Sequence, residues 1–157
     1  MKLRRKVSAG CAVLCVLLCG LLSAGCGKAG APKPEKVQVV NPLMEVASPE
    51  EMEQYLDYSV PVLEKEADAY IVLVFDGYPQ MGRIRYADGA VFNMQYGSGD
   101  ISGIYGGTLE STEACGEMEV SYYVYEELRY ALWETGGFTY SLSGGEDLKA
   151  DVAALIG

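Results

Sequence analysis

The stretch Leu128-Arg-Tyr-Ala-Leu-Trp-Glu-Thr-Gly-Gly-Phe-Thr-Tyr-Ser-Leu142 decides the fold of this chain. Aromatic and aliphatic residues, which favour strands, flank a Thr-Gly-Gly sequence, so the stretch is predicted to form a β-hairpin. A turn at Thr135-Gly136 would pair Trp133 with Phe138, whereas a turn at Gly136-Gly137 would pair Trp133 with Tyr140. Both registers place these three aromatic residues on one face, which we expect to belong to the core.

Five further segments before this hairpin have the composition of strands. The alternation is clearest in the last of them, where every second residue from Met118 to Val124 is hydrophobic. Asp88-Gly89 supplies the positive φ that a hairpin turn needs. Together with the two runs of the hairpin, these segments predict about six or seven antiparallel strands. They are Tyr70–Phe75, Met81–Tyr86, Val91–Tyr96, Ile101–Tyr105 and Glu117–Tyr125.

Two short amphipathic helices are predicted, one on each side of the strands. The sequence Ser48-Pro49-Glu50-Glu51 combines a capping box with a proline at the first helical position. This helix should end near Asp57, because Pro61 cannot continue it. The second helix follows the acidic pair Glu146-Asp147, which suits a helix N-terminus. Its apolar stripe consists of Leu148, Val152, Leu155 and Ile156.

These elements predict an α+β fold class. We expect a single curved antiparallel β-meander of about six or seven strands, because consecutive strands are linked by turns. The short N- and C-terminal helices should pack on one face, and the Trp133 face is the best candidate. The opposite face would then hold Ser121, Tyr123, Tyr125, Tyr130, Leu132, Thr139 and Ser141.

The N-terminal segment ends in Leu21-Leu22-Ser23-Ala24-Gly25-Cys26. Lysines and arginines near the start precede an apolar run, and small residues then precede Cys26, which is the layout of a secretory signal. The cysteine makes this segment resemble the lipobox of a bacterial lipoprotein. The resemblance implies cleavage after residue 25 and a lipid on Cys26. The alternative is an uncleaved transmembrane anchor, but the apolar run is short for a span of about 20 residues.

On this interpretation the chain has three parts. Residues 1–25 are a lipoprotein signal peptide, residues 26–40 are the lipidated cysteine and a flexible tether, and residues 41–157 are a β-rich extracytoplasmic domain. The protein is expected on the extracytoplasmic face of the cell membrane as a lipid-anchored protein. Cys115 would be left without an internal disulfide partner. It is a reactive thiol, the site of an intermolecular bridge, or an incidental half-buried residue.

The segment after residue 25 is strongly acidic. It holds all 22 acidic residues and only eight of the 12 basic ones. This balance argues against a nucleic-acid partner, because phosphates need Lys and Arg. It also argues against a domain that lies flat on anionic lipid. The expected membrane contact is therefore the lipid on Cys26.

The chain contains no histidine, which removes Ser-His-Asp and Cys-His nucleophile systems and the usual zinc sites. The glycine-dense stretch 97–107 is not followed by the helix that a phosphate loop needs, so we expect two turns around a short strand there. A loose cation site of Asp100 with Glu110 or Glu113 lacks the spacing of a calcium loop. We therefore predict no catalytic residue, no metal and no cofactor, and we do not expect an enzyme.

Tyrosine is unusually frequent, with 12 residues against three Phe and one Trp. We expect Tyr123, Tyr125 and Tyr130 to lie on the face away from the helices. If they converge, they form an exposed aromatic patch, which is a candidate surface for a protein, peptide or glycan. The alternative is that they are ordinary strand residues, because Tyr fits a half-buried pleat.

Several short motifs occur in a characteristic order between Asn41 and Ile156. They are Met44-Glu-Val46, Ser48 with Glu50-Glu51, Ile84-Arg-Tyr86 before Asp88-Gly89, Asp100-Ile-Ser-Gly103 with Tyr105, Ala131-Leu-Trp133 and Gly137-Phe-Thr-Tyr-Ser-Leu142. The order resembles a domain of unknown function found in lipoproteins and membrane-anchored proteins of Gram-positive bacteria. Relatives of that domain are attached to regulators of sigma factors and sporulation.

The resemblance implies an extracytoplasmic β-rich domain, and it assigns no catalytic residues. The expected function is a non-catalytic binding or sensing module on the cell surface. The alternative is a structural or accessory subunit of an envelope complex, and an enzyme comes last. An aromatic patch or a lined groove on the uncovered face of the sheet would favour the binding module.

Overall fold

The computed structural model describes residues 41–157. The expected signal peptide, the lipidation site Cys26 and the tether all lie outside the described residues. Among those that are described, no helix has the length and hydrophobicity needed to cross a membrane.

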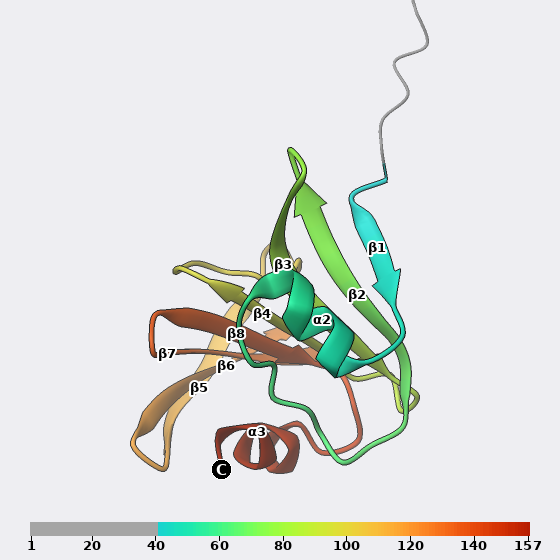
Figure 1. The fold of residues 1–157 in the computed structure, drawn as a ribbon. Coiled ribbons are helices and arrows are strands. Elements are labelled where there is room, and N and C mark those ends of the chain that lie inside the picture. The colour runs from blue at the N-terminus through green and yellow to red at the C-terminus, as the bar shows by residue number, and fades with distance from the viewer. Residues whose placement is uncertain (1–40) are drawn as a thin grey trace, which may run out of the picture. The chain divides into compact units, whose positions relative to one another are not determined.

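The described residues form a mostly-β fold, in which eight antiparallel strands make one sheet and two short helices accompany it (Figure 1). The spatial order of the strands is β1-β2-β3-β4-β8-β7-β6-β5. The strands are β1 Leu43–Val46, β2 Ala67–Phe75, β3 Tyr78–Tyr86, β4 Val91–Tyr96, β5 Thr108–Cys115, β6 Met118–Tyr125, β7 Leu128–Thr135 and β8 Phe138–Ser143. The helices are α2, Pro49–Leu56, and α3, Leu148–Ile156.

The predicted single antiparallel sheet is confirmed, but it has eight strands instead of six or seven, and it is not one meander. Two four-stranded meanders, β1 to β4 and β5 to β8, are joined because β4 pairs with β8. The sequence missed the two edge strands. β1 is only four residues long, and β5 reads Thr-Leu-Glu-Ser-Thr-Glu-Ala-Cys, a polar run with little hydrophobic alternation. Edge strands face water along one side, so neither needs the apolar pattern of a central strand.

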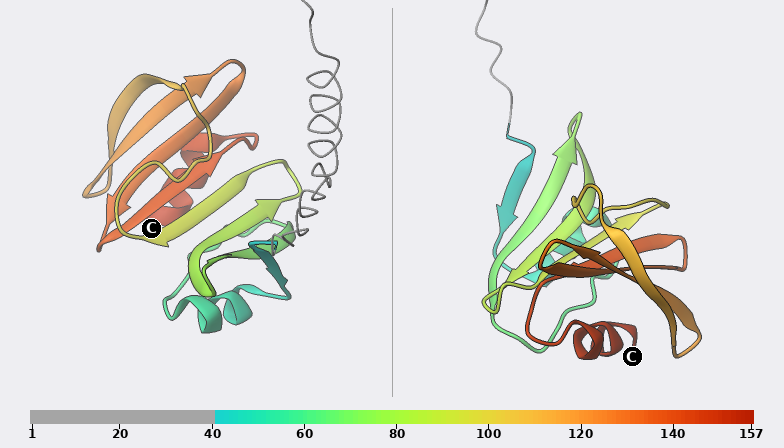
Figure 2. Two further views of the ribbon diagram at one scale, coloured as in Figure 1. Left: turned by 90° about the horizontal axis from the view of Figure 1, so that it is seen from above. Right: turned by 180° about the vertical axis from the view of Figure 1, so that it is seen from behind.

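The glycine-dense stretch 97–107 connects the two meanders. β4 lies in the middle of the sheet and β5 lies at its far edge, so this connection must pass over β8, β7 and β6. It runs on the side of the sheet away from α2 (Figure 2, right). The expected short strand Ile101–Tyr105 does not form. Instead, Gly97, Gly99, Gly103 and Gly106 adopt positive φ values and bend the segment across the sheet.

The C-terminal hairpin adopts the register that turns at Gly136-Gly137. Trp133 lies opposite Tyr140, and both turn glycines have positive φ values. We call the face of the sheet that carries Trp133 and Tyr140 the inner face. The same face carries a row of apolar residues that runs from one meander into the other. This row consists of Ile84, Phe92, Leu142, Ala131 and Tyr122.

Both helices pack on the inner face, as predicted. Met52 and Leu56 of α2 and Val152 of α3 belong to one continuous core cluster. α2 starts at the expected cap, because Ser48 Oγ accepts a hydrogen bond from the backbone N of Glu51 at 3.3 Å. The segment between α2 and β2 covers the rest of this face with buried Val60 and Leu63.

Candidate functional site

The face of the sheet opposite the helices, here called the outer face, holds the residues expected there. Ser121 lies opposite Leu132, and Leu132 lies opposite Ser141, so the three side chains form a row across β6, β7 and β8. Tyr123 lies opposite Tyr130 in the adjacent row of the same face. The face assignment made from the hydrophobic alternation is therefore correct.

The expectation that all three tyrosines are exposed is wrong for Tyr130. Tyr130 is only 2% exposed, while Tyr123 is partly buried and Tyr125 is 40% exposed. The cause is the segment 97–107, because its Gly107 approaches the Tyr130 hydroxyl so closely that a Cβ there would overlap it. This contact could not be predicted from local sequence patterns, because it depends on the pairing of β4 with β8.

Tyr123 and Tyr130 form a stacked pair on the outer face. Their ring centroids are 5.0 Å apart, and their planes are inclined by 13°. Tyr130 packs beneath the segment 97–107, and Tyr123 remains partly open to solvent. A rigid aromatic pair of this kind offers a ready-made contact surface that loses little conformational entropy on binding.

A hollow of about 570 Å³ lies between the aromatic pair and the segment 97–107. We call it the outer-face hollow. Tyr123, Tyr130 and Ser121 line it from the sheet, and Gly107 and Ile104 line it from the crossing segment. Three carboxylates complete the lining: Asp100, Glu119 and Glu134.

The wall of the hollow is held in place by its own polar groups. The backbone N of Gly97 donates to the carbonyl of Gly137 at 2.8 Å, and Thr139 Oγ1 donates to the carbonyl of Gly97 at 2.7 Å. Further along, Asp100 Oδ1 accepts from the backbone N of Ser102 at 2.8 Å and from Ser102 Oγ at 2.6 Å. The segment is therefore pinned at its start and folded locally by Asp100, which keeps the space beneath it open.

A buried polar chain lies beside the hollow on the same face. Arg83 Nε donates to Asn93 Oδ1 at 2.7 Å, and Asn93 Nδ2 donates to Ser141 Oγ at 2.9 Å. Asn93 and Ser141 are fully buried. Burial, and then the charge of nearby Arg85, lower the pKa of Arg83. These polar groups bond to one another across β3, β4 and β8, so they fix the junction of the two meanders.

A second hollow, of about 590 Å³, lies between α3 and the second meander. Both basic side chains in its lining are paired with carboxylates. Lys149 Nζ contacts the two carboxylate oxygens of Glu113 at 2.6 and 2.8 Å, and Arg129 contacts Glu110 at 3.4 Å. The structure thus places Glu110 and Glu113 in this hollow and Asp100 in the outer-face hollow. The loose cation site of Asp100 with either glutamate, which the sequence did not favour, is therefore not assembled in the structure.

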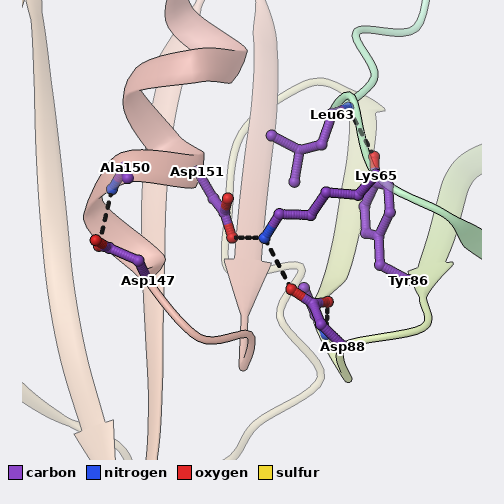
Figure 3. A network of polar contacts seen from close by, with 8 residues as sticks. Leu63, Lys65, Tyr86, Asp88, Asp147, Ala150 and Asp151 are labelled. Carbon is purple, nitrogen blue, oxygen red and sulfur yellow. Dashed lines mark hydrogen bonds and ion pairs between the residues drawn. The ribbon is translucent and has the colours of Figure 1, made fainter.

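The most buried carboxylate belongs to a structural network. Lys65 Nζ contacts Asp88 Oδ2 at 2.8 Å and Asp151 Oδ2 at 2.5 Å, and it thereby ties α3 to the β3–β4 turn (Figure 3). Beside it, the backbone N of Leu63 donates to the Tyr86 hydroxyl at 3.0 Å (Figure 3). These groups line neither hollow, so they serve packing rather than ligand contact.

No protein family model, no curated protein and no solved structure matches this chain. The resemblance to the domain of Gram-positive lipoproteins therefore stays a prediction. Cys115 carries a free thiol and is partly buried at the end of β5. Its side chain lines neither of the two hollows.

Proposed function

We propose that this protein is a membrane-tethered, extracytoplasmic binding module and not an enzyme. The observation that carries the proposal is the outer-face hollow, in which a stacked aromatic pair, hydroxyl groups and carboxylates surround one space beneath a crossing segment. Ligand sites combine an apolar or aromatic surface with a few fixed polar groups in this way. The ligand is a small polar molecule, neutral or basic, because the lining carries carboxylates.

The membrane part of the proposal rests on the sequence. Charged, apolar and small residues precede Cys26 in the order of a lipoprotein signal, and residues 27–40 separate this cysteine from the domain. A lipid on Cys26 would hold the domain at the cell surface. The strongly acidic domain would stand away from anionic lipid headgroups, which leaves the outer face open to ligands.

Binding at the hollow is tested by NMR on the chain from Cys26 to Gly157, with a panel of small polar compounds that covers sugars, amino acids and short peptides. A true ligand should shift the backbone amides of Gly99, Gly106 and Gly107, which line the hollow. Tyr123→Ser should weaken that binding by about tenfold or more, since a stacked aromatic contact is lost.

The matched control is Tyr78→Ser. Tyr78 is 71% exposed at the start of β3 and lines neither hollow, so its loss should leave affinity unchanged. If no compound of the panel shifts the glycine amides, or if both variants weaken binding equally, the outer-face hollow is not the binding site.

A further inference from the structure

We infer that the outer-face hollow selects an organic cation, namely an ammonium group carried on a compact polar body. This inference rests on the proposed function, because it takes the hollow to be a ligand site. It adds the chemical class of the ligand. Three independent features of the hollow support it: its charge, a hydroxyl group without a partner, and the spacing of its carboxylates.

The first feature is uncompensated negative charge. Asp100, Glu119 and Glu134 line the hollow, and no basic side chain does. Residues 41–157 contain 21 acidic and only five basic residues, and four of the five basic residues are held elsewhere. Lys65 contacts Asp88 and Asp151, and Arg83 contacts Asn93. Arg129 contacts Glu110, and Lys149 contacts Glu113. The hollow therefore attracts positive charge from outside the chain.

The second feature is the hydroxyl group of Tyr130. The side chain is almost fully buried and lines the hollow, and its hydroxyl forms no hydrogen bond to any other described residue. No buried side-chain oxygen of the described residues lacks a partner, so this hydroxyl oxygen is itself accessible to solvent. Burial, and then the charge of Asp100, raise the pKa of Tyr130, so this hydroxyl keeps its proton at neutral pH. It can donate to an oxygen of a ligand whose ammonium group lies at the carboxylates. The ligand should therefore carry a hydroxyl or carbonyl oxygen in addition to its amino group.

The third feature is the spacing of the carboxylates. Within residues 41–157, no three acidic or cysteine side chains come close enough together to hold a metal ion. Ser121 of β6 pairs with Leu132 of β7. Glu119 and Glu134 each lie two residues along their own strand from this pair, so both belong to the same face of the sheet. The three carboxylates line a space of about 570 Å³ from the sheet and from the crossing segment, and this space has room for an organic cation. The stacked face of Tyr123 and Tyr130 adds a favourable surface for such a cation.

The test uses two pairs of probes, and in each pair acetylation of the amino group removes the positive charge. Glucosamine is compared with N-acetylglucosamine, and Nα-acetyl-lysine amide is compared with its Nε-acetylated form. Affinities are measured by titration calorimetry and amide shifts on the chain from Cys26 to Gly157, at about pH 6. The charged member of at least one pair should bind about tenfold more tightly than its neutral partner, as expected for a charge-assisted hydrogen bond. The pair that responds identifies the source as an amino sugar or as a lysine side chain.

Three charge-neutralising variants separate the hollow from the general acidity of the domain. Glu119→Gln and Glu134→Gln should each weaken binding of the charged probe several-fold and leave the neutral probe unchanged. The control is Glu117→Gln, which removes the same charge from the exposed turn between β5 and β6 and should have no such effect. Equal weakening by all three variants would mean that only overall charge matters, and it would overturn the inference.

The remaining outcomes separate this inference from the proposed function. If charged and neutral probes bind equally at the glycine amides of the hollow, the cation selectivity is wrong and the binding module stands. If none of the four probes moves those amides while another compound of the panel does, the selectivity is again wrong. If no compound moves them, both proposals are wrong.

Discussion

Trp133 of β7 lies directly opposite Tyr140 of β8, with ring centroids 5.3 Å apart and planes only 6° from parallel. Phe92 of β4 lies within 6.3 Å of both rings. Phe92 and Tyr140 come from β4 and β8, whose pairing joins the two meanders, and Trp133 comes from the neighbouring strand β7. The aromatic layer therefore stabilises the only pairing that makes one sheet of the two meanders.

Truncation of Trp133 should be strongly destabilising. The side chain is 4% exposed, and it packs on Phe92 and Tyr140. Trp133→Ala should lower the free energy of unfolding by about 3–5 kcal/mol, because it leaves a cavity where the meanders meet. Urea denaturation followed by circular dichroism measures the change. Tyr105→Ala is the control, since Tyr105 is 90% exposed, and a loss below about 1 kcal/mol for Trp133→Ala would contradict the assignment of the core.

Local patterns in the sequence were sufficient to predict which residues share a face. Alternation in β6 to β8 placed Trp133 and Tyr140 inside and Ser121 and Tyr123 outside, and the structure agrees. The Ser48 cap and the end of α2 at Asp57 were likewise predictable, because capping depends on neighbouring residues only. The order of the strands was not predictable in this way, since β4 pairs with β8 over more than 40 intervening residues.

The candidate site illustrates the same limit. Tyr123 and Tyr130 could be assigned to the outer face from the sequence, but the segment that covers Tyr130 could not. A glycine-dense connection between two strands normally indicates turns, and here it indicates a crossing over three strands. Its four positive-φ glycines were the available clue, because they allow a backbone to lie close against a sheet.

The three tyrosines of the outer face should respond differently to substitution. Tyr130→Ser should lower the free energy of unfolding by about 2–4 kcal/mol, because it removes a buried ring from beneath Gly107. Tyr125→Ser should change it by less than about 1 kcal/mol, because Tyr125 is already 40% exposed. Thermal denaturation of the single variants measures both. Equal effects would mean that the segment 97–107 does not cover Tyr130 in solution.

Lipidation should depend on Cys26. In a Gram-positive host that receives the full chain, Cys26→Ala should abolish incorporation of labelled palmitate and block cleavage after residue 25. Cys115→Ser is the control, because Cys115 lies within the folded domain and should not affect processing. If the wild-type chain itself incorporates no palmitate and keeps an uncleaved N-terminus, the segment is a transmembrane anchor and not a lipoprotein signal.

Lys65 should stabilise the docking of α3. Lys65→Met leaves the buried carboxylate of Asp151 without its partner at 2.5 Å, so the free energy of unfolding should fall by about 1–3 kcal/mol. Urea denaturation at neutral pH measures the loss. Lys149→Met is the matched control, since its partner Glu113 is exposed to solvent and needs no compensation. If the two variants behave alike, the Lys65 network contributes no more than a surface ion pair.

Asp88, which belongs to the same network, should make the free energy of unfolding depend on pH in the acidic range. Hydrogen bonds from Lys65 and from the backbone N of Ala90 lower the pKa of Asp88 below its ordinary value of 3.8. A carboxylate of this kind contributes stability that is fully present above its unfolded pKa and is lost as the pH falls through its folded pKa. The substitution Asp88→Asn should therefore destabilise the protein at neutral pH. Between about pH 5 and pH 2, the free energy of unfolding of the variant should fall by less than that of the wild type. Parallel curves for variant and wild type, in urea titrations across that range, would show that the Lys65–Asp88 contact does not persist in solution.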